Sequence, residues 1–157
     1  MTNLDLGQRV YGYMRTCHVA TLATIGADGP WAAAVFYVSD GYTLYFLSSP
    51  RSRHCRNLAH DPRVAVTVQA DYSEWHEIKG VQLEGEATLL TGDEEERARQ
   101  LYALKFPLIG KLEGAPAAIA KALFRVRWYS VVPSRVFFID NSIGFGHRDE
   151  IIPTRAR

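Results

Sequence analysis

Two Asp-Gly dipeptides constrain the fold of this chain more than any other feature of its sequence. Asp28-Gly29 and Asp40-Gly41 separate stretches that are rich in β-branched and apolar residues. Asp-Gly between such stretches favours a tight hairpin turn, because glycine accepts the positive φ that these turns require. The sequence therefore predicts three consecutive strands, over residues 18–25, 31–39 and 42–48, joined as an antiparallel meander.

Helix signals flank this meander. Apolar residues at helical spacing predict a helix over residues 3–16. Ser49-Pro50 is typical of a helix start, with Ser49 as the N-cap, and Asp61-Pro62 marks the end of that helix. Residues 91–106 are predicted as a helix whose acidic first turn complements the helix dipole. One small helix is expected within residues 108–122.

Further strands are predicted in the second part of the chain. They cover residues 63–70, 78–90, 124–132 and 134–140, and Pro133 separates the last two. Gly80 and Gly85 inside the long strand mark β-bulges or places of close backbone approach. With the meander this gives six or seven strands and two or three helices. The sequence therefore predicts a mainly β (α+β) fold, a small closed antiparallel barrel with helices attached.

Length and charge narrow the class of protein. The chain has 157 residues, which suits a single domain over residues 1–157, with a helix at 1–16 and a tail at 141–157. Its 18 Lys+Arg and 17 Asp+Glu nearly balance, which argues against a general nucleic-acid-binding protein. We find neither an apolar run of transmembrane length nor a secretion signal, so we expect a cytoplasmic protein without a membrane partner. Cys17 and Cys55 make neither a disulfide framework nor a zinc ribbon.

The segment with the most chemical content is residues 48–58, Ser-Ser-Pro-Arg-Ser-Arg-His-Cys-Arg-Asn-Leu. A strand there delivers two hydroxyl groups, and the helix start that follows presents unpaired backbone N–H groups and a partial positive charge. Ser52, Arg53 and His54 add hydrogen-bond donors and a guanidinium suited to phosphate oxygens. This pattern predicts a phosphate cradle. The alternative is that the arginines only solvate a helix surface and that Ser49 only caps the helix.

Other candidate sites are less well supported. His54 and His60 face different sides of the predicted helix, and no carboxylate is well placed beside them or Cys55, so no metal site is predicted. Trp75-His76-Glu77 is interpreted as a turn with a packed tryptophan, the alternative being a loop over a cofactor. Gly144-Phe145-Gly146 lacks the third glycine and the following helix of a dinucleotide-binding motif.

The order of these segments is similar to that of a known family. HVATLAT, DGPW, DGYTLYFLSS, the Ser-Arg-His helix start and NLAHDPRVAVTV follow one another as in the pyridoxamine-phosphate-oxidase-like FMN-binding split-barrel superfamily, which this chain resembles. The stretches 78–107 and 137–148 resemble a small branch of that superfamily. The resemblance implies a six-stranded antiparallel Greek-key split β-barrel with flanking helices. It also implies a homodimer with two flavin sites at the interface.

The resemblance carries over to particular positions. The phosphate-binding Ser-Arg-Lys element of the family corresponds to Ser52, Arg53 and His54, with histidine in place of lysine. An ordinary histidine carries a full charge only below about pH 6.5, so this replacement implies weaker or pH-dependent flavin binding. The hydroxyl at the end of the preceding strand corresponds to Ser48. The strand whose backbone lines the isoalloxazine ring corresponds to Ala33, Ala34, Val35 and Phe36.

Other positions depart from the oxidases of the superfamily. Those enzymes have an arginine near Ala33, a lysine near Phe36 or Tyr37 and a glutamine near Gly80, and this chain has none of them. Lys79 is only a neighbouring candidate for the last contact. The substrate-reading tryptophan and arginine of the oxidases have no clear match, although Trp128 and Arg127 are the nearest residues in kind. These departures argue against pyridoxamine phosphate oxidation itself.

The resemblance implies an FMN-binding oxidoreductase that transfers hydride or electrons between a nicotinamide donor and a small organic acceptor or flavin. The flavin ring would carry the chemistry, and we find no general acid or base in the sequence. Three alternatives remain open. The first is a reductase that uses the deazaflavin F420, whose acidic tail would meet Arg127, Arg135 or Arg148. The second is a haem-handling protein with His147 as the ligand to test. The third is a non-enzymatic protein that stores or senses FMN or another phosphate ligand.

Overall fold

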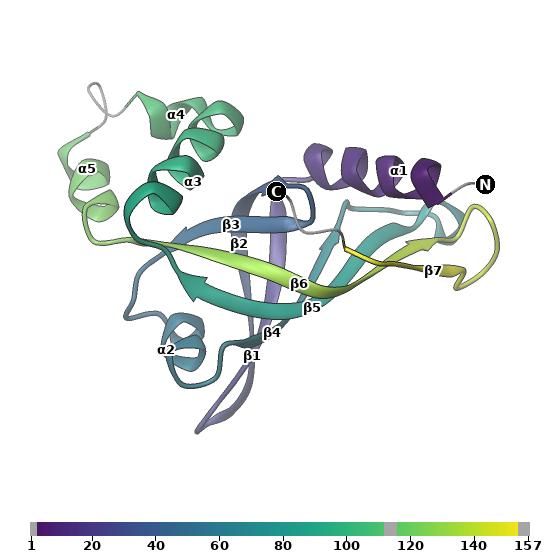
Figure 1. Cartoon of the computed structure of the whole chain (residues 1–157), viewed down its shortest axis with the longest axis horizontal. Helices are drawn as coiled ribbons and strands as arrows, with labels where there is room; N and C mark the ends of the chain where they lie inside the picture. Colours follow the sequence, from purple (N-terminus) through teal and green to yellow (C-terminus); the bar gives the residue numbers. More distant parts are fainter. Residues whose placement is uncertain (1–2, 112–115, 154–157) are drawn as a thin grey trace.

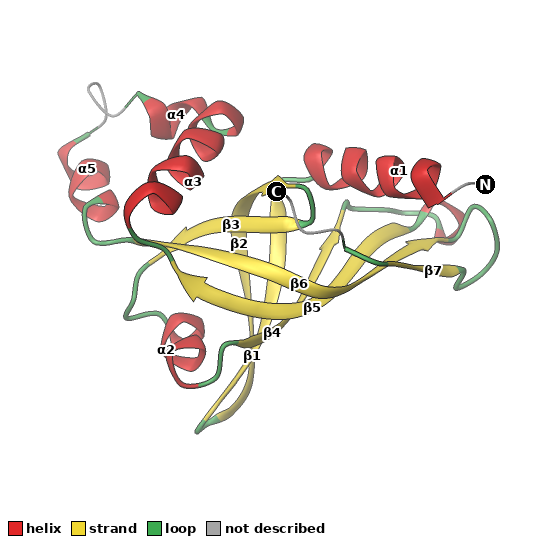
Figure 2. Ribbon diagram, in the orientation of Figure 1, coloured by secondary structure: helices red, strands yellow, loops and turns green. Residues whose placement is uncertain are grey.

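The computed structural model describes residues 3–111 and 116–153, which form one antiparallel sheet with helices around it (Figures 1 and 2). The sheet has seven strands in the order β3-β2-β1-β4-β5-β6-β7, and pairing of β3 with β6 closes the first six into a barrel. Strands β4-β1-β2-β3 have the spatial order of a Greek key. The predicted six-stranded barrel with flanking helices is therefore confirmed. The strands are β1 (Val19–Gly26), β2 (Gly29–Asp40), β3 (Thr43–Ser48), β4 (Arg63–Gln69), β5 (Lys79–Leu89), β6 (Arg127–Asp140) and β7 (Arg148–Ile151).

Both Asp-Gly dipeptides form the predicted hairpin turns. Gly29 has a φ of 92° and Gly41 a φ of 62°, in the left-handed region that glycine enters without a steric penalty. Gly26 pairs with Gly29, and Asp40 pairs with Thr43, so each hairpin reverses over two residues. The local chemistry of these turns thus sets the register of the first three strands.

Helices cover the ends and one side of the barrel. They are α1 (Asn3–Thr16), α2 (Arg53–His60), α3 (Gly92–Lys105), α4 (Pro107–Gly110), α5 (Ala117–Leu123) and the 3₁₀ turn η1 (Trp75–Glu77). The predicted helices over residues 3–16 and 91–106 are confirmed. Figure 1 shows α1 at one end of the barrel and α2 at the opposite end, beside the β1–β2 hairpin.

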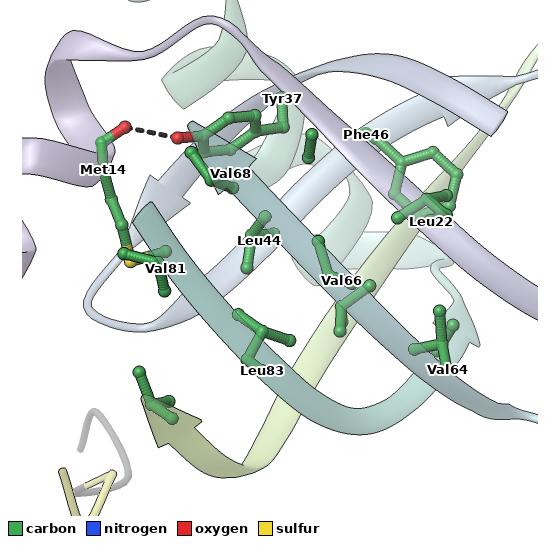
Figure 3. Close-up of a cluster of buried hydrophobic side chains, with 14 of the residues drawn as sticks. Met14, Leu22, Tyr37, Leu44, Phe46, Val64, Val66, Val68, Val81 and Leu83 are labelled. Atoms are coloured by element: carbon green, nitrogen blue, oxygen red, sulfur yellow. Dashed lines mark hydrogen bonds between the residues drawn. The ribbon is translucent and has the colours of Figure 1, made fainter. Parts of the chain in front are cut away.

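Alternate strand residues fill the barrel with apolar side chains (Figure 3). These buried residues include Leu22, Leu44, Phe46, Val64, Val66, Val68, Val81, Leu83, Val131, Val136 and Phe138. α1 closes one end, where Met14 is buried and its backbone oxygen accepts a hydrogen bond from the Tyr37 hydroxyl at 2.5 Å. A second cluster attaches α3 to the outside of the barrel, and it consists of Val38, Leu90, Ala98, Tyr102 and Trp128. Burial of each large apolar side chain stabilises such packing by about 1.5–3 kcal/mol.

The predicted start of α2 is wrong by three residues. Ser49 and Pro50 form a turn, closed by a hydrogen bond from the Ser52 N–H to the Ser49 backbone oxygen at 2.9 Å. The helix begins at Arg53 with Ser52 as its N-cap, and the Ser52 hydroxyl accepts from the Cys55 N–H. Ser-Pro is also a common turn dipeptide, and here the turn competes successfully with the helix start.

The predicted break at Pro133 is also wrong, because β6 continues through it. The pairing of β5 with β6 shifts register between Glu84 and Gly85, and Gly85 then pairs with Pro133. A Cβ at Gly85 would lie 2.2 Å from the Val132 backbone oxygen, so the close approach at this bulge requires glycine. The bulge predicted at Gly85 is therefore what accommodates the proline, whereas Gly80 keeps regular pairing with Ile139.

The end of the chain differs from the prediction in two places. Two short helices, α4 and α5, replace the one expected within residues 108–122, and residues 112–115 lie outside the described residues. Within the expected tail, β7 pairs with β6 and extends the sheet. Across residues 3–111 and 116–153, no helix has the length and apolar character needed to span a membrane.

Candidate cofactor-binding site

α2 is held against the end of β1 by a close contact. A Cβ at Gly26 would lie 2.0 Å from the Asn57 side-chain oxygen, so any larger residue there would have to displace the Asn57 side chain. The Asn57 amide nitrogen also donates to the Thr24 hydroxyl at 3.0 Å. These contacts hold α2 beside the β1–β2 hairpin (Figure 1).

Three of the predicted phosphate-site residues meet where β3 ends and α2 begins. The His54 Nε2 atom lies 2.7 Å from the Ser48 Oγ and 3.2 Å from the Ser52 Oγ. The two hydroxyl oxygens are 3.4 Å apart. His54 is buried, and a histidine between two serine hydroxyls can exchange donor and acceptor roles with them as its tautomer changes.

The helix start beside this cluster offers free backbone donors. The Ser52 and Arg56 N–H groups donate to backbone oxygens, and the Cys55 N–H donates to the Ser52 hydroxyl. The N–H groups of Arg53 and His54 have no hydrogen-bond partner among the described residues. Free N–H groups and the positive end of the helix dipole together favour an anion at this position.

Cys55 belongs to the same cluster. Burial raises the pKa of the Cys55 thiol, but hydrogen bonds with His54, Ser52 and Tyr129 outweigh burial, and the net effect lowers it. Burial, together with the hydrogen bond to Cys55, raises the pKa of the Tyr129 phenol. The Tyr129 ring stacks on Phe46 with centroids 5.2 Å apart. Cys55, Tyr129 and Phe46 therefore pack together next to the serine–histidine cluster.

Arg53 points away from the serine–histidine cluster. Its Nη2 atom donates to the Asp28 backbone oxygen at 3.0 Å, and its guanidinium carbon lies 4.4 Å from the centroid of the Trp31 ring. The guanidinium is therefore stacked on the β1–β2 hairpin. One of its five N–H donors is used there, which leaves others for a ligand between the hairpin and α2.

The sequence analysis did not group Arg127 with the candidate phosphate-site residues, but the structure places it at the same end of the barrel. β3 pairs with β6 so that Ser48 lies directly across from Arg127. Residues paired across antiparallel strands present their side chains on the same face. The two positions are far apart in the sequence, and only the closure of the barrel brings them together.

β2 has an open backbone edge along the predicted ring-binding stretch. β3 pairs with β2 only from Tyr37 to Asp40, so residues 30–36 pair with β1 alone. The Tyr37 N–H donates to the His18 backbone oxygen. Backbone groups alternate in direction along an antiparallel strand, so those of Ala34 and Phe36 point away from β1, toward the open edge.

The side chains of this stretch divide between two faces. Ala34 and Phe36 lie on the outside of the barrel, where Phe36 is 57% exposed, whereas the partly buried Ala33 and Val35 lie on the other face. The exposed apolar residues Val19 and Ile25 and the alanines Ala23 and Ala32 continue the outer face across β1 and β2. We call this surface, with Ala34 and Phe36, the outer apolar face.

A groove of about 310 Å³ lies beside the outer apolar face. Thr21, Thr67 and Gln82 supply polar groups to it, and Phe137 and Arg148 form its far side. The Arg148 guanidinium lies 5.0 Å from the Phe137 ring centroid. A planar aromatic ligand on this face would therefore meet both apolar and polar groups.

The other predicted basic and histidine candidates lie near β7. Arg135 donates to Glu150 at 2.9 Å and lies 3.5 Å from Glu84, so carboxylates already balance its charge. His147 Nε2 lies 2.8 Å from a carboxylate oxygen of Asp149. Metal-ligating side chains form no cluster of three or more within the described residues.

The environment of Trp75 in the 3₁₀ turn η1 differs from the prediction that this tryptophan is packed. Trp75 is 56% exposed, and its ring contacts the Phe145 ring at a centroid distance of 5.8 Å. The Asn141 side chain donates to the Trp75 backbone oxygen at 2.9 Å. The turn was predicted correctly, but its tryptophan lies at the surface beside the loop that follows β6.

A closed six-stranded antiparallel barrel with a helix start at an open strand edge defines the class of pyridoxamine-phosphate-oxidase-like split barrels. The family model described as pyridoxamine 5'-phosphate oxidase matches residues 8–139. The chain therefore belongs to this family.

Curated relatives match over most of their length. A UPF0306 protein from Klebsiella pneumoniae is 35% identical over 133 residues, which cover 83% of this chain and 82% of that protein. A UPF0306 protein from Yersinia pestis strain Angola is 31% identical over 150 residues, which cover 94% of each chain. The names of these relatives give a family designation and no activity.

Solved structures share the fold. A heme binding protein from Mycobacterium smegmatis is 28% identical with a TM-score of 0.67, and the match covers 89% of this chain and 55% of that chain. This chain thus spans about half the length of that protein. Campylobacter jejuni ChuZ has a TM-score of 0.76 at 16% identity, covering 97% of this chain and 61% of that chain. HutZ, a heme storage protein from Vibrio cholerae, has a TM-score of 0.64 at 19% identity, covering 82% of this chain and 89% of that chain.

Proposed function

We propose that this chain is an FMN-binding oxidoreductase, active as a cytoplasmic homodimer, that transfers hydride or electrons between a nicotinamide donor and a small organic acceptor. One observation carries the proposal. The anion-binding groups at the start of α2 lie at the same end of the barrel as the open backbone edge of β2. A phosphate-bearing ligand with a planar ring needs both features.

The phosphate of FMN would bind at the start of α2. The hydroxyls of Ser48 and Ser52 and the free N–H groups of Arg53 and His54 would donate hydrogen bonds to its oxygens. Arg53 would add charge from the hairpin side, and Arg127 from the strand beside Ser48. Charged hydrogen bonds of this kind are about twice as strong as neutral ones.

The ring would be held mainly by backbone groups. Ala34 and Phe36 direct their N–H and C=O groups to the open edge of β2, where they can match the alternating donors and acceptors of the pyrimidine edge. Bound FMN would supply two-electron and one-electron chemistry. Phe36 and the neighbouring alanines would exclude water from one side of the ring.

The outer apolar face supports the proposed homodimer. Phe36, Ile25 and Val19 are exposed together on it, and contiguous exposed apolar patches on soluble proteins mark interaction sites. A second copy of the chain would cover this face and complete the water-excluding pocket. The ligand would then touch residues of both protomers.

The first test is the visible absorption spectrum of protein purified without added cofactor, followed by titration with FMN. We expect flavin bands and saturation at about one FMN per chain. Turnover of NADH or NADPH with the bound flavin then separates an enzyme from a storage or sensing protein. If bound FMN oxidised NADH or NADPH no faster than free FMN does, the protein would be a flavin-binding protein and not an enzyme. Absence of FMN binding would overturn the proposal.

Haem is the second candidate ligand. The heme binding protein of Mycobacterium smegmatis shares 28% identity over 89% of this chain. Asp149 lies 2.8 Å from one ring nitrogen of His147, and such a carboxylate orients a histidine and strengthens it as a ligand. Hemin titration of wild type and His147→Ala distinguishes this candidate. A Soret band shift that disappears in the variant supports haem, whereas equal spectra argue against His147 as the ligand.

A further inference from the structure

A second groove lies at the other end of β2, away from the hairpin that carries Trp31. It has a volume of about 360 Å³ and lies between α1 and α3, next to the last residues of β2. Arg15 comes from α1, Ser39 from β2, and Leu101, Leu104 and Lys105 from α3. The proposed flavin site uses none of these residues.

Two cations, Arg15 and Lys105, line this groove. Lys105 is partly buried, with its Nζ atom 2.5 Å from the Cys17 backbone oxygen and 4.3 Å from the Tyr37 ring centroid. Burial lowers the pKa of the Lys105 ammonium, the Cys17 thiol opposes this, and the Arg15 guanidinium lowers it further. Within the described part of the chain, neither Arg15 nor Lys105 forms an ion pair.

The acidic residue of the groove is already engaged. Asp40 lies in the lining, but its carboxylate forms an ion pair with Arg97 on α3. The Tyr11 hydroxyl, also in the lining, accepts a hydrogen bond from the Gly41 N–H at 2.7 Å. Lys105 uses one of its three N–H donors on the Cys17 carbonyl, which leaves two for another acceptor. The groove therefore has unused positive charge and unused donors.

Ser39 provides a second, independent observation. Its Oγ atom is the one buried side-chain nitrogen or oxygen without a hydrogen-bond partner in the described residues. Buried polar atoms are nearly always paired, because an unpaired one costs about 1–3 kcal/mol. Ser39 belongs to the groove lining, so a rotation of its side chain would bring the hydroxyl to a ligand there, which would supply the missing partner.

The rest of the lining is apolar. Val38 and Leu101 contribute to the wall, and Leu104 at the rim is 81% exposed. A ligand for this groove therefore needs an apolar body as well as an anionic group. We propose that the groove binds a small amphipathic carboxylate, with the carboxylate near Arg15, Lys105 and Ser39 and the apolar part against Val38, Leu101 and Leu104.

The test uses hexanoate as the probe and hexan-1-ol as its uncharged counterpart. Each is titrated into the full chain, and backbone amide shifts are followed by NMR. We expect hexanoate to cause saturable shifts at Ser39, Leu104 and Lys105, and hexan-1-ol to bind more weakly at the same place. Equal affinity for the two compounds would overturn the proposal, because the cations would then contribute nothing.

Two variants and one control sharpen the test. Arg15→Gln removes an exposed charge and should weaken hexanoate binding about three- to five-fold, while Arg125→Gln, an exposed arginine elsewhere, should leave it unchanged. Ser39→Ala should weaken binding but leave the melting temperature equal or higher, since it removes an unpaired buried hydroxyl. Unchanged hexanoate affinity in both groove variants would overturn the assignment. FMN binding is measured in parallel and should be the same in all of them.

Discussion

Arg53 shows how a single side chain can serve both the fold and a ligand. Its guanidinium stacks on Trp31 and donates to the Asp28 backbone oxygen, which ties α2 to the tip of the β1–β2 hairpin. This anchoring limits the rotamers of a side chain that is otherwise flexible. An arginine held in place loses less entropy when it meets a phosphate, so the same contacts that stabilise the hairpin favour ligand binding.

The first prediction concerns this residue. Arg53→Ala should weaken FMN binding by about 1.5–3 kcal/mol, the range for a charged hydrogen bond. Fluorescence titration of FMN measures this, and Arg51→Ala on the exposed turn before α2 is the matched control. If Arg53→Ala bound FMN as tightly as the wild type, the phosphate site would have to lie elsewhere.

The second prediction concerns Cys55. Its thiol is buried and hydrogen-bonded with His54, Ser52 and Tyr129, so it stabilises the arrangement of the serine–histidine cluster. Serine can keep these hydrogen bonds, so Cys55→Ser should bind FMN with an affinity within about two-fold of wild type. Isothermal titration calorimetry checks this. Loss of binding would show that the thiol itself contributes to the ligand site.

At the scale of elements, local signals were sufficient where one turn or one helix face decides the structure. Asp28-Gly29 and Asp40-Gly41 set the hairpins, and the apolar spacing of residues 3–16 set α1. Prediction failed where a distant strand decides the outcome. Pro133 stays within β6 because Gly85 on β5 makes room for it, and no pattern around Pro133 contains that information.

The third prediction follows from this bulge. A Cβ at Gly85 would lie 2.2 Å from the Val132 backbone oxygen and 2.8 Å from the Pro133 Cα, and backbone atoms cannot move aside cheaply. Gly85→Ala should therefore destabilise the fold by about 2–4 kcal/mol. The control is Gly12→Ala on the exposed side of α1, which meets no atom within 4 Å and should stabilise the helix. Urea unfolding measures both. Equal stability of Gly85→Ala and wild type would mean that the bulge can relax.

The fourth prediction concerns the contact between α1 and the end of β6. Asp140 is 1% exposed, and its carboxylate lies 2.6 Å from Arg9 and accepts from the Ser142 N–H at 3.0 Å. Burial alone would raise the pKa of Asp140, but the Ser142 hydrogen bonds and the charges of Lys79 and Arg9 outweigh it, and the pKa is lowered.

A lowered folded-state pKa means that this carboxylate stabilises the fold above its unfolded pKa of about 3.9 and that this stability is lost as pH falls below that value. The melting temperature of wild type should therefore fall steeply below about pH 4. Asp140→Asn should start lower at neutral pH and show a shallower acid decline. Parallel pH profiles of the two proteins would contradict this role for Asp140.

At the scale of the whole molecule, only part of the candidate site could be predicted from the sequence. Ser48, Ser52 and His54 are close in the sequence, so local reasoning could bring them together. Arg127 lies across from Ser48 only because β3 closes the barrel on β6. The open edge of β2 likewise depends on where β3 stops pairing, which local propensity does not encode. Barrel closure therefore creates the parts of the site that the sequence alone could not predict.

The last prediction links assembly to ligand binding. Phe36 is exposed on the outer apolar face and also directs its backbone groups to the open edge of β2. If a second copy covers this face, a charge there must be desolvated on association, which is strongly unfavourable. Phe36→Glu should therefore convert the dimer to a monomer and reduce FMN affinity at least about ten-fold, because the flavin would lose its cover.

Analytical ultracentrifugation and FMN titration of the same samples test this link. Phe124→Glu is the control, since Phe124 is 91% exposed at the C-terminal end of α5, and its substitution should change neither mass nor affinity. A Phe36→Glu protein that remains dimeric would place the interface elsewhere. A monomer that keeps full FMN affinity would show that each protomer holds the flavin alone. Only the joint loss of dimer and flavin supports a site shared between two protomers.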